Sequence, residues 1–356
     1  MAFGLYIHIP YCHAKCRYCD FYSQGASRQV PQEYVQALLR EMEDLPRPHT
    51  LYLGGGTPSL LSPRQVSDLI EKANPLPGSE ITLEANPETL SPALLKGFRE
   101  AGVNRLSIGV QTAYDSQLKV LGRLHTAAQA RECFDWARAA GFENISGDIM
   151  MALPGYTREE FQATLDLIVQ GGATHISAYL LKIEPGTAFG RKPPAHLPDE
   201  DQAADFYLEA VVQLEALGYH QYEISNFARP GFEGQHNLIY WNCEDYLGLG
   251  PAAHSCMGGK RFYWPSSTQS FIEGSVCPTE DGICGGWDYI ILRLRLVQGL
   301  DLALLKERYG MEFSSRQMAF LRQCVQAGYA RLENGVLALT PRGMIIQNTI
   351  LTQLME

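Results

Sequence analysis

Short apolar runs and longer amphipathic segments alternate along the first two thirds of the chain. The apolar runs predict strands at residues 5–9, 51–53, 81–84, 105–109, 145–150 and 175–181, with a further one at 220–224. The segments between them predict helices at residues 32–44, 63–73, 92–101, 127–140 and 158–170. Strands that alternate with helices form parallel sheets with right-handed crossovers. The pattern therefore predicts an α/β fold, a partial (β/α)6 barrel rather than a closed eightfold one.

The pattern changes after residue 227 and divides the chain into three parts. Residues 1–227 form the predicted barrel. Residues 228–286 are rich in glycine and show little periodicity, but their aromatic content argues against disorder, and we expect them to cover the open side of the barrel. Residues 287–356 predict a small α+β domain of the winged-helix type. Its predicted elements are helices at 302–309, 314–327 and 341–354, and a hairpin of strands 329–332 and 336–339 around Asn334-Gly335.

Composition and charge exclude several classes of protein. Hydrophobic residues make up 46% of the chain and charged residues 19%, so the chain can bury a large core and is not disordered. The net charge of −10 argues against nucleic acid or a membrane surface as the main partner. No segment has the length and apolar character of a membrane-spanning helix. Nine cysteines without a secretory signal indicate a reducing compartment, and we expect the cytoplasm.

Three cysteines follow the first predicted strand at a spacing that suits a metal centre. Cys12, Cys16 and Cys19 lie within eight residues, just after Pro10 ends the strand. Thiolates are soft ligands that favour zinc or an iron–sulfur cluster. Structural zinc takes four protein ligands, and no second Cys-x2-Cys pair follows in the sequence. A cubane cluster held by three cysteines leaves one iron open; the alternative is a zinc knot or buried thiols without a metal.

Polar and glycine residues gather where the predicted strands end. Gly54-Gly55-Gly56-Thr57 follows the second strand, and a glycine run lets backbone N–H groups approach an anionic ligand. Glu84, Gln111 and Asp148 lie in or just after the next strands, and Arg123 lies beyond the fourth. Each of them alone is commonly structural. Because functional residues of such barrels gather at the ends of the strands, the set predicts a polar ring around one cavity.

The cysteine spacing resembles that of the radical SAM (S-adenosylmethionine) superfamily. Two further motifs, Tyr6-x-His8-Ile9-Pro10 before it and Gly54-Gly-Gly-Thr-Pro58 after it, resemble the branch of anaerobic coproporphyrinogen oxidases and their relatives. The resemblance implies a (β/α)6 core and a 4Fe–4S cluster on the three cysteines, with SAM on the open iron. The positions that match contacts to this SAM are Tyr6, Gly55 and Glu84. The positions that match contacts to a second SAM are Tyr18, Gly56, Thr57, Gln111, Arg123 and Asp148, although Lys182 replaces a small residue of that set.

A second motif lies in the glycine-rich segment, at His236-Asn-x-x-Tyr240-Trp241. A histidine beside aromatic rings has the chemistry to bind heme iron while the rings pack on the macrocycle. The alternative is a histidine that donates hydrogen bonds inside a packed loop. With Tyr246-Leu-Gly-Leu-Gly after it, the motif resembles heme-binding relatives of the oxidases, which implies heme at His236, Tyr240 and Trp241. Cys243, Cys256, Cys277 and Cys284 lie nearby and are interpreted as structural, with Cys243 or Cys256 as the rival heme ligand.

The resemblance leaves three functions open. The favoured one is a heme chaperone that passes heme to an acceptor protein, a membrane-associated acceptor being one alternative. The second is an oxygen-independent coproporphyrinogen III oxidase, in which a 5′-deoxyadenosyl radical abstracts hydrogen from propionate side chains. The third is a radical SAM enzyme of another substrate. The oxidases carry a further cysteine where this chain has Phe21. They also have a long N-terminal extension, whereas five residues precede Tyr6 in this sequence. Both departures favour the chaperone.

Overall fold

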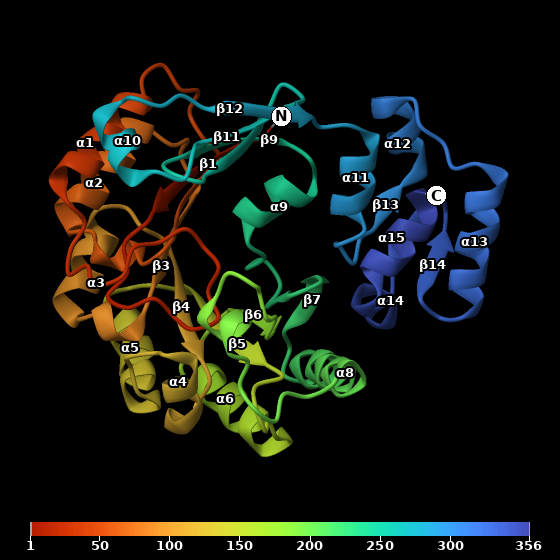
Figure 1. Ribbon diagram of the computed structural model, residues 1–356, viewed down its shortest axis with the longest axis horizontal. Coiled ribbons are helices and arrows are strands. Elements are labelled where there is room, and N and C mark those ends of the chain that lie inside the picture. Colours follow the sequence, from red (N-terminus) through yellow and green to blue (C-terminus); the bar gives the residue numbers. More distant parts are fainter. Residues whose placement is uncertain (1, 356) are drawn as a thin grey trace.

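The computed structural model describes residues 2–355 and shows an α/β body with a smaller C-terminal domain beside it (Figure 1). Six parallel strands form the centre of the body and neighbour one another in chain order. They are β1 (Phe3–Ile9), β2 (Thr50–Gly55), β3 (Glu80–Ala85), β4 (Arg105–Gln111), β5 (Asn144–Met151) and β6 (His175–Leu180). The predicted partial (β/α)6 barrel is confirmed.

Helices connect these strands and lie around the outside of the sheet (Figure 1). They are α1 (Gln32–Glu41), α2 (Pro63–Ala73), α3 (Pro92–Glu100), α4 (Asp115–Leu121), α5 (Ala127–Ala139) and α6 (Arg158–Gln170), with short 3-10 helices η1 (Pro58–Leu60) and η2 (Pro87–Thr89). The sequence did not predict α4, because its seven residues present only two buried side chains, Leu118 and Leu121. The other five helices lie where the amphipathic pattern predicted them.

Alternation along each strand separates the helix-covered face from the barrel interior. Leu5, Ile7 and Ile9 of β1 are fully buried in the main core. Because successive side chains of a strand point to opposite faces, Tyr6 and His8 point into the barrel. The same alternation places apolar residues of β2 and β3 under the helices and Tyr52 and Glu84 inside. The barrel interior is therefore lined by polar and aromatic side chains.

The seventh predicted strand exists but does not continue the parallel series. After α7 (Ala188–Arg191) and α8 (Glu200–Ala216), β7 (His220–Glu223) pairs antiparallel with β8 (Asn226–Ala228). The strand that pairs with β6 is β8, also in antiparallel orientation. A hairpin thus ends the sheet on this side, because only two residues separate the two strands.

Residues 229–283 extend the sheet on the other side, beyond β1. After α9 (Gln235–Trp241), β9 (Asp245–Leu249) pairs parallel with β1. The strands β10 (His254–Met257), β11 (Lys260–Tyr263) and β12 (Thr279–Ile283) add antiparallel to it, with α10 (Thr268–Glu273) between the last two. The expectation of little regular structure was wrong, because short strands and glycine turns such as Gly258-Gly259 leave no long periodic run. None of the residues of this segment lines the cavity at the strand ends, and its role as a cover of the open side stays a prediction.

The C-terminal domain has its own core of buried residues, among them Leu294, Leu321 and Leu337. Its elements are α11 (Gly286–Arg293), β13 (Leu300–Asp301), α12 (Leu302–Tyr309), α13 (Ser315–Gln326), β14 (Ala330–Glu333), β15 (Val336–Leu339), α14 (Pro341–Ile345) and α15 (Gln347–Met355). The predicted hairpin is present, with positive φ at Asn334 and Gly335. The single last helix was a wrong prediction, because the chain turns at Ile346 and divides it into α14 and α15.

Among residues 2–355, no helix combines the length and the apolar character that crossing a membrane requires.

Candidate functional site

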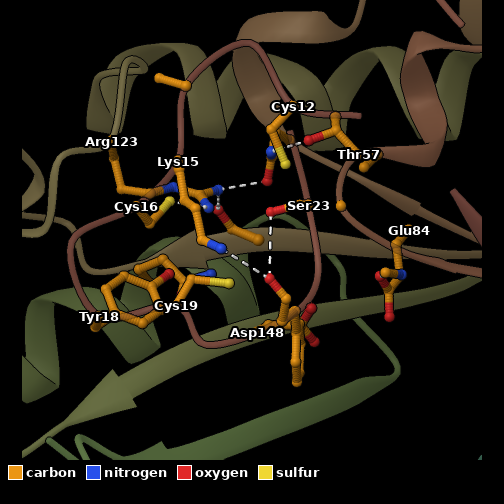
Figure 2. Close-up of a pocket in the computed structure, with 18 of the residues that line it drawn as sticks. Cys12, Lys15, Cys16, Tyr18, Cys19, Ser23, Thr57, Glu84, Arg123 and Asp148 are labelled. Atoms are coloured by element: carbon orange, nitrogen blue, oxygen red, sulfur yellow. Dashed lines mark hydrogen bonds between the residues drawn. The ribbon is translucent and has the colours of Figure 1, made fainter. Parts of the chain in front are cut away.

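A cavity of about 350 Å³ opens where the parallel strands end (Figure 2). Eleven of the residues singled out from the sequence line it: Cys12, Cys16, Tyr18, Cys19, Gly55, Gly56, Thr57, Glu84, Gln111, Arg123 and Asp148. They come from the loop after β1, the end of β2 and the loop after it, strands β3, β4 and β5, and, for Arg123, the connection between α4 and α5. The predicted polar ring around one cavity is therefore present.

The three cysteines of the ring belong to the loop after β1, whose ends are pinned together. The Gln24 N–H donates to the Pro10 carbonyl oxygen at 2.7 Å. Burial raises the pKa of the Cys19 thiol to about 11. The Arg123 guanidinium works in the opposite direction, because its Nη1 lies 3.6 Å from Cys16 Sγ and a nearby cation favours the thiolate. The loop presents soft donors beside a fixed positive charge.

The glycine loop after β2 lies against the end of β1 with no room for side chains. The Gly56 N–H donates to the Ile9 carbonyl oxygen at 2.8 Å. A Cβ atom on Gly56 would lie 2.7 Å from that oxygen and 2.8 Å from the Tyr11 carbonyl oxygen. Gly55 has a φ of 111°, and a Cβ atom there would lie 2.5 Å from the His8 ring. The contact between the glycine loop and the cysteine loop therefore requires glycine at both positions.

Glu84 is a buried carboxylate held by two donors. The Tyr52 hydroxyl donates to its Oε1 at 2.7 Å, and the Gly55 N–H donates to its Oε2 at 3.0 Å. Burial raises the pKa of Glu84 to about 7, although both hydrogen bonds oppose the shift. Each oxygen keeps a lone pair after accepting one hydrogen bond. Glu84 can therefore receive a further donor from the cavity, most strongly when it is ionised.

Arg123 and Asp148 are each fixed by hydrogen bonds inside the barrel. Arg123 Nη2 donates to Asn86 Oδ1 and to the Gly109 carbonyl oxygen, both at 2.6 Å. The Ser107 hydroxyl lies 2.9 Å and 3.0 Å from the two carboxylate oxygens of Asp148 and donates to them. Burial raises the pKa of Asp148, and hydrogen bonds from serines oppose the shift. The ring thus holds one cation and two carboxylates in defined places.

Sequence reasoning missed several residues of the cavity. They are Ala14, Lys15, Asp20, Ser23, Ala85, Asn86, Ser107, Gly109, Met150 and Tyr179, whereas Phe21 and Pro58, which also line the cavity, were named in the sequence motifs. Strand alternation offered a signal for Ser107, because it pairs with Glu84 in the register of β3 and β4 and points to the same side. Lys182, in contrast, does not line the cavity; it is 81% exposed and its ammonium lies 2.6 Å from Glu184.

Tyr6 lies outside the cavity, in an aromatic layer across the barrel. Its ring centroid lies 6.1 Å from that of Tyr52 and 6.5 Å from that of His236, and the last two rings stack at 5.0 Å. Gly54 makes room for this layer, because a Cβ atom there would lie within 3 Å of both tyrosine rings. The Tyr6 hydroxyl is paired with His8 Nδ1 at 3.0 Å. The match of Tyr6 to a SAM contact is therefore not reproduced by its side chain in this structure.

His236 lies on α9, on the other side of the aromatic layer from the cavity. It is 1% exposed, and both ring nitrogens have partners: Nδ1 pairs with Thr50 Oγ1 at 2.7 Å and Nε2 with the Tyr240 hydroxyl at 2.6 Å. Glu80 accepts hydrogen bonds from the His236 and Gln235 backbone at 3.1 Å and 3.0 Å. Thr50 and Glu80 begin β2 and β3, so α9 packs at the end of the barrel opposite the cavity. In this conformation His236 is the packed, hydrogen-bonded histidine of the alternative interpretation.

Known protein families match both the barrel and the C-terminal domain of the chain. The radical SAM superfamily matches residues 6–168, and the HemN C-terminal domain matches residues 288–346. The heme chaperone HemW of Bacillus subtilis is 36% identical, with 97% of each chain covered. The heme chaperone HemW of Haemophilus influenzae is 34% identical, with 98% of this chain and 96% of the other covered. The coproporphyrinogen III oxidase HemN from Escherichia coli has the same fold, with a TM-score of 0.84 at 23% identity over 99% of this chain and 90% of the other.

Radical SAM membership implies a 4Fe–4S cluster and SAM, and the cavity offers donors for both. Among residues 2–355, no group of three or more His, Cys, Asp or Glu side chains is arranged to hold a single metal ion. A cubane cluster differs from a single ion, because each cysteine binds a different iron and the sulfurs need not gather around one centre. Three thiols of one loop around a shared cavity fit that requirement.

We predict that Gly56→Ala lowers the amount of cluster that the protein accepts. The new Cβ atom displaces the backbone at Ile9 or Tyr11, next to Cys12, and overpacking of this kind costs about 1–3 kcal/mol. Gly186→Ala is the matched control, because no atom lies within 4 Å of its Cβ position. Iron and sulfide per chain after anaerobic reconstitution measure the effect. Equal iron in G56A and wild type would contradict the required close contact.

We also predict that SAM binding strengthens as pH rises towards 7. The raised pKa of Glu84, about 7, means that its carboxylate, the acceptor for the N–H groups of the iron-bound SAM amino group, is lost as pH falls through that value. Affinity should fall about tenfold per pH unit below the pKa and level off above it. Glu84→Gln should bind SAM weakly with a flat pH profile. Titrations from pH 6 to 8, with the cluster absorbance followed in parallel, test this; an unchanged slope in E84Q would assign the titration to another group.

Proposed function

The chain belongs to the HemW family of heme chaperones, and we propose that it binds heme and transfers it to an acceptor protein. The observation that carries the proposal is 36% identity to one such chaperone across 97% of both chains. Relatives of the same name from five further strains are 33% to 42% identical. The match to the HemN C-terminal domain supports a role for residues 288–346 in the same function.

We assign the cluster to Cys12, Cys16 and Cys19, whose thiols line the cavity. When bound, the cluster supplies an open iron that takes the amino and carboxylate groups of SAM. Glu84 would accept hydrogen bonds from that amino group, whereas the Gly55 and Gly56 N–H groups already donate to Glu84 and to the Ile9 carbonyl oxygen. Tyr18, Thr57, Gln111, Arg123 and Asp148 line the remaining space and would contact the rest of SAM. Lys182, which replaces a small residue of the second-SAM set, lies outside the cavity and is paired with Glu184, so a second SAM would lack that contact.

We place heme at α9, where His236, Tyr240 and Trp241 lie. Burial lowers the pKa of His236 to about 3, so its imidazole is neutral near pH 7 and needs no deprotonation before it binds iron. The Tyr240 hydroxyl blocks Nε2 and must move away first. Tyr240 and Trp241 are half-buried, and the Arg295 guanidinium lies 4.3 Å from the Trp241 ring centroid. Heme binding therefore requires α9 to rearrange, at least locally, from the conformation described here.

Phe21 favours the chaperone over the oxidase. The resemblance places a further cysteine of the oxidases at this position, and Phe21 supplies an apolar ring without a thiol. Phe21 lines the cavity and is 61% exposed, so the position that lacks the thiol lies at the mouth of the cavity. The likeness to the oxidase structure supports the fold alone, because the two chains share 23% of their residues.

The proposal predicts heme uptake without decarboxylation. The reconstituted protein is given heme in one sample, and coproporphyrinogen III with SAM and a reductant in another. We expect a stable heme spectrum in the first sample and no release of carbon dioxide from coproporphyrinogen III in the second. The triple variant C12A/C16A/C19A should lose the iron–sulfur absorbance and stay folded, because the barrel core does not depend on metal. Decarboxylation of coproporphyrinogen would select the oxidase instead.

A further prediction separates ligation by His236 from a structural role. If Nε2 binds iron, removing its competitor in Tyr240→Phe should tighten heme binding about fivefold, the worth of one hydrogen bond of about 1 kcal/mol. Tyr246→Phe is the control, because its ring packs on Tyr240 at 4.5 Å without this bond. His236→Ala should shift the heme spectrum strongly. An unchanged spectrum in H236A, with a thiolate-type signal, would move the ligand to Cys243 or Cys256.

A further inference from the structure

Three cysteines outside the cavity lie together, and the proposed function does not use them. Cys243 follows α9, Cys256 lies in β10, and Cys284 lies between β12 and α11. The Sγ atoms of Cys243 and Cys284 are 3.1 Å apart. Cys256 also shares a hydrogen bond with Cys284, which lowers the pKa of Cys256. For Cys284, the hydrogen bond with Cys243 lowers the pKa, but the one with Cys256 and burial raise it to about 11. The two thiols that touch are 41 positions apart in the sequence.

The contact suits disulfide formation better than metal binding. Thiolates on a tetrahedral zinc ion, 2.3 Å from the metal, lie about 3.8 Å apart, which is farther than these two sulfurs. A disulfide bond is about 2.05 Å long, so the Cys243 and Cys284 sulfurs need to approach by about 1 Å. Both residues are half-buried, which leaves them within reach of a small molecule, whereas Cys256 is buried.

We propose that Cys243 and Cys284 form a redox site that reacts with a low-molecular-weight disulfide such as oxidised glutathione. One protein thiolate attacks the small disulfide, whose S–S bond breaks as a mixed disulfide forms and one small thiol leaves. The second protein thiol then displaces the other small thiol, and the Cys243–Cys284 bond forms. The two protein thiols are oxidised, the small disulfide is reduced to two thiols, and these carry the two protons away.

The place of this bond connects it to the heme motif. Cys243 ends the segment that carries α9, and its carbonyl oxygen accepts a hydrogen bond from Arg308 of the C-terminal domain at 3.4 Å. Arg308 also donates to the Asn242 carbonyl oxygen at 3.4 Å. A Cys243–Cys284 disulfide would fasten the end of α9 to the chain that enters α11. This consequence rests on the proposed function, in which Tyr240 has to move away from His236 before heme binds. The disulfide holds α9 in place and thereby slows heme uptake.

The chemical test uses the full-length, cluster-loaded protein under anaerobic conditions. After treatment with oxidised glutathione, free thiols are alkylated and unreduced peptides are identified by mass spectrometry. We expect two thiols to disappear and a peptide pair to be linked through Cys243 and Cys284. Cys243→Ser and Cys284→Ser should lack this pair, whereas Cys277→Ser, which removes an exposed thiol outside the group, should keep it. Unchanged thiols, a Cys256–Cys284 link, or glutathione on Cys277 alone would overturn the assignment.

Heme uptake by the same samples tests the consequence. The oxidised wild type and C277S should take up heme about tenfold more slowly than their reduced forms, which corresponds to about 1.4 kcal/mol. Dithiothreitol should restore the rate, and oxidation should not change the rate of C243S. A linked protein that takes up heme at the reduced rate would overturn the control of α9. If neither form binds heme, the proposed function fails, and the linked peptide still decides the redox site.

Discussion

The candidate site depends on a close backbone contact between the ends of β1 and β2. Gly56 hydrogen-bonds to Ile9 at 2.8 Å and leaves no space for a Cβ atom, so the glycine loop lies directly on the start of the cysteine loop. This contact brings Cys12 and Thr57 to one cavity. The neighbouring Gly55 N–H also fixes Glu84, because it donates to the Glu84 carboxylate at 3.0 Å. A glycine run that is weak evidence by itself thus becomes informative through the residues it touches.

The barrel carries a candidate site at each of its two ends. At the carboxyl ends of the strands, thiols, Glu84, Arg123 and Asp148 surround a cavity suited to a cluster and SAM. At the other end, α9 closes the barrel with His236 buried beneath it. Tyr52 belongs to both sites, because its hydroxyl donates to Glu84 at 2.7 Å while its ring stacks on His236 at 5.0 Å. Tyr52 is therefore a direct contact between the two ends of the barrel.

The sequence predicted those parts of the structure that local pattern determines. The six parallel strands follow from outward apolar residues such as Leu5 and Ile7, and the polar ring follows from where the strands end. The surroundings of His236 were beyond the sequence, because its partner Thr50 is 186 positions away and no local pattern relates the two. The short strands β9 to β12 were missed because they are brief and separated by turns such as Gly258-Gly259, and only β9 is placed by the distant partner β1. The hydrogen-bonded conformation of His236 depends on just these long-range contacts.

The central claim is that the cluster and heme occupy opposite ends of one barrel. Broadening of the electron paramagnetic resonance signal of the reduced cluster by high-spin ferrous heme, compared between the cluster-only and the doubly loaded, fully reduced protein, tests it most directly. The five residue steps from Thr50 to Gly55 along β2 span about 16 Å, so a separation on the order of 15 Å or more is predicted. Strong coupling of the kind that adjacent centres show would place heme at the mouth of the cluster cavity and contradict the account.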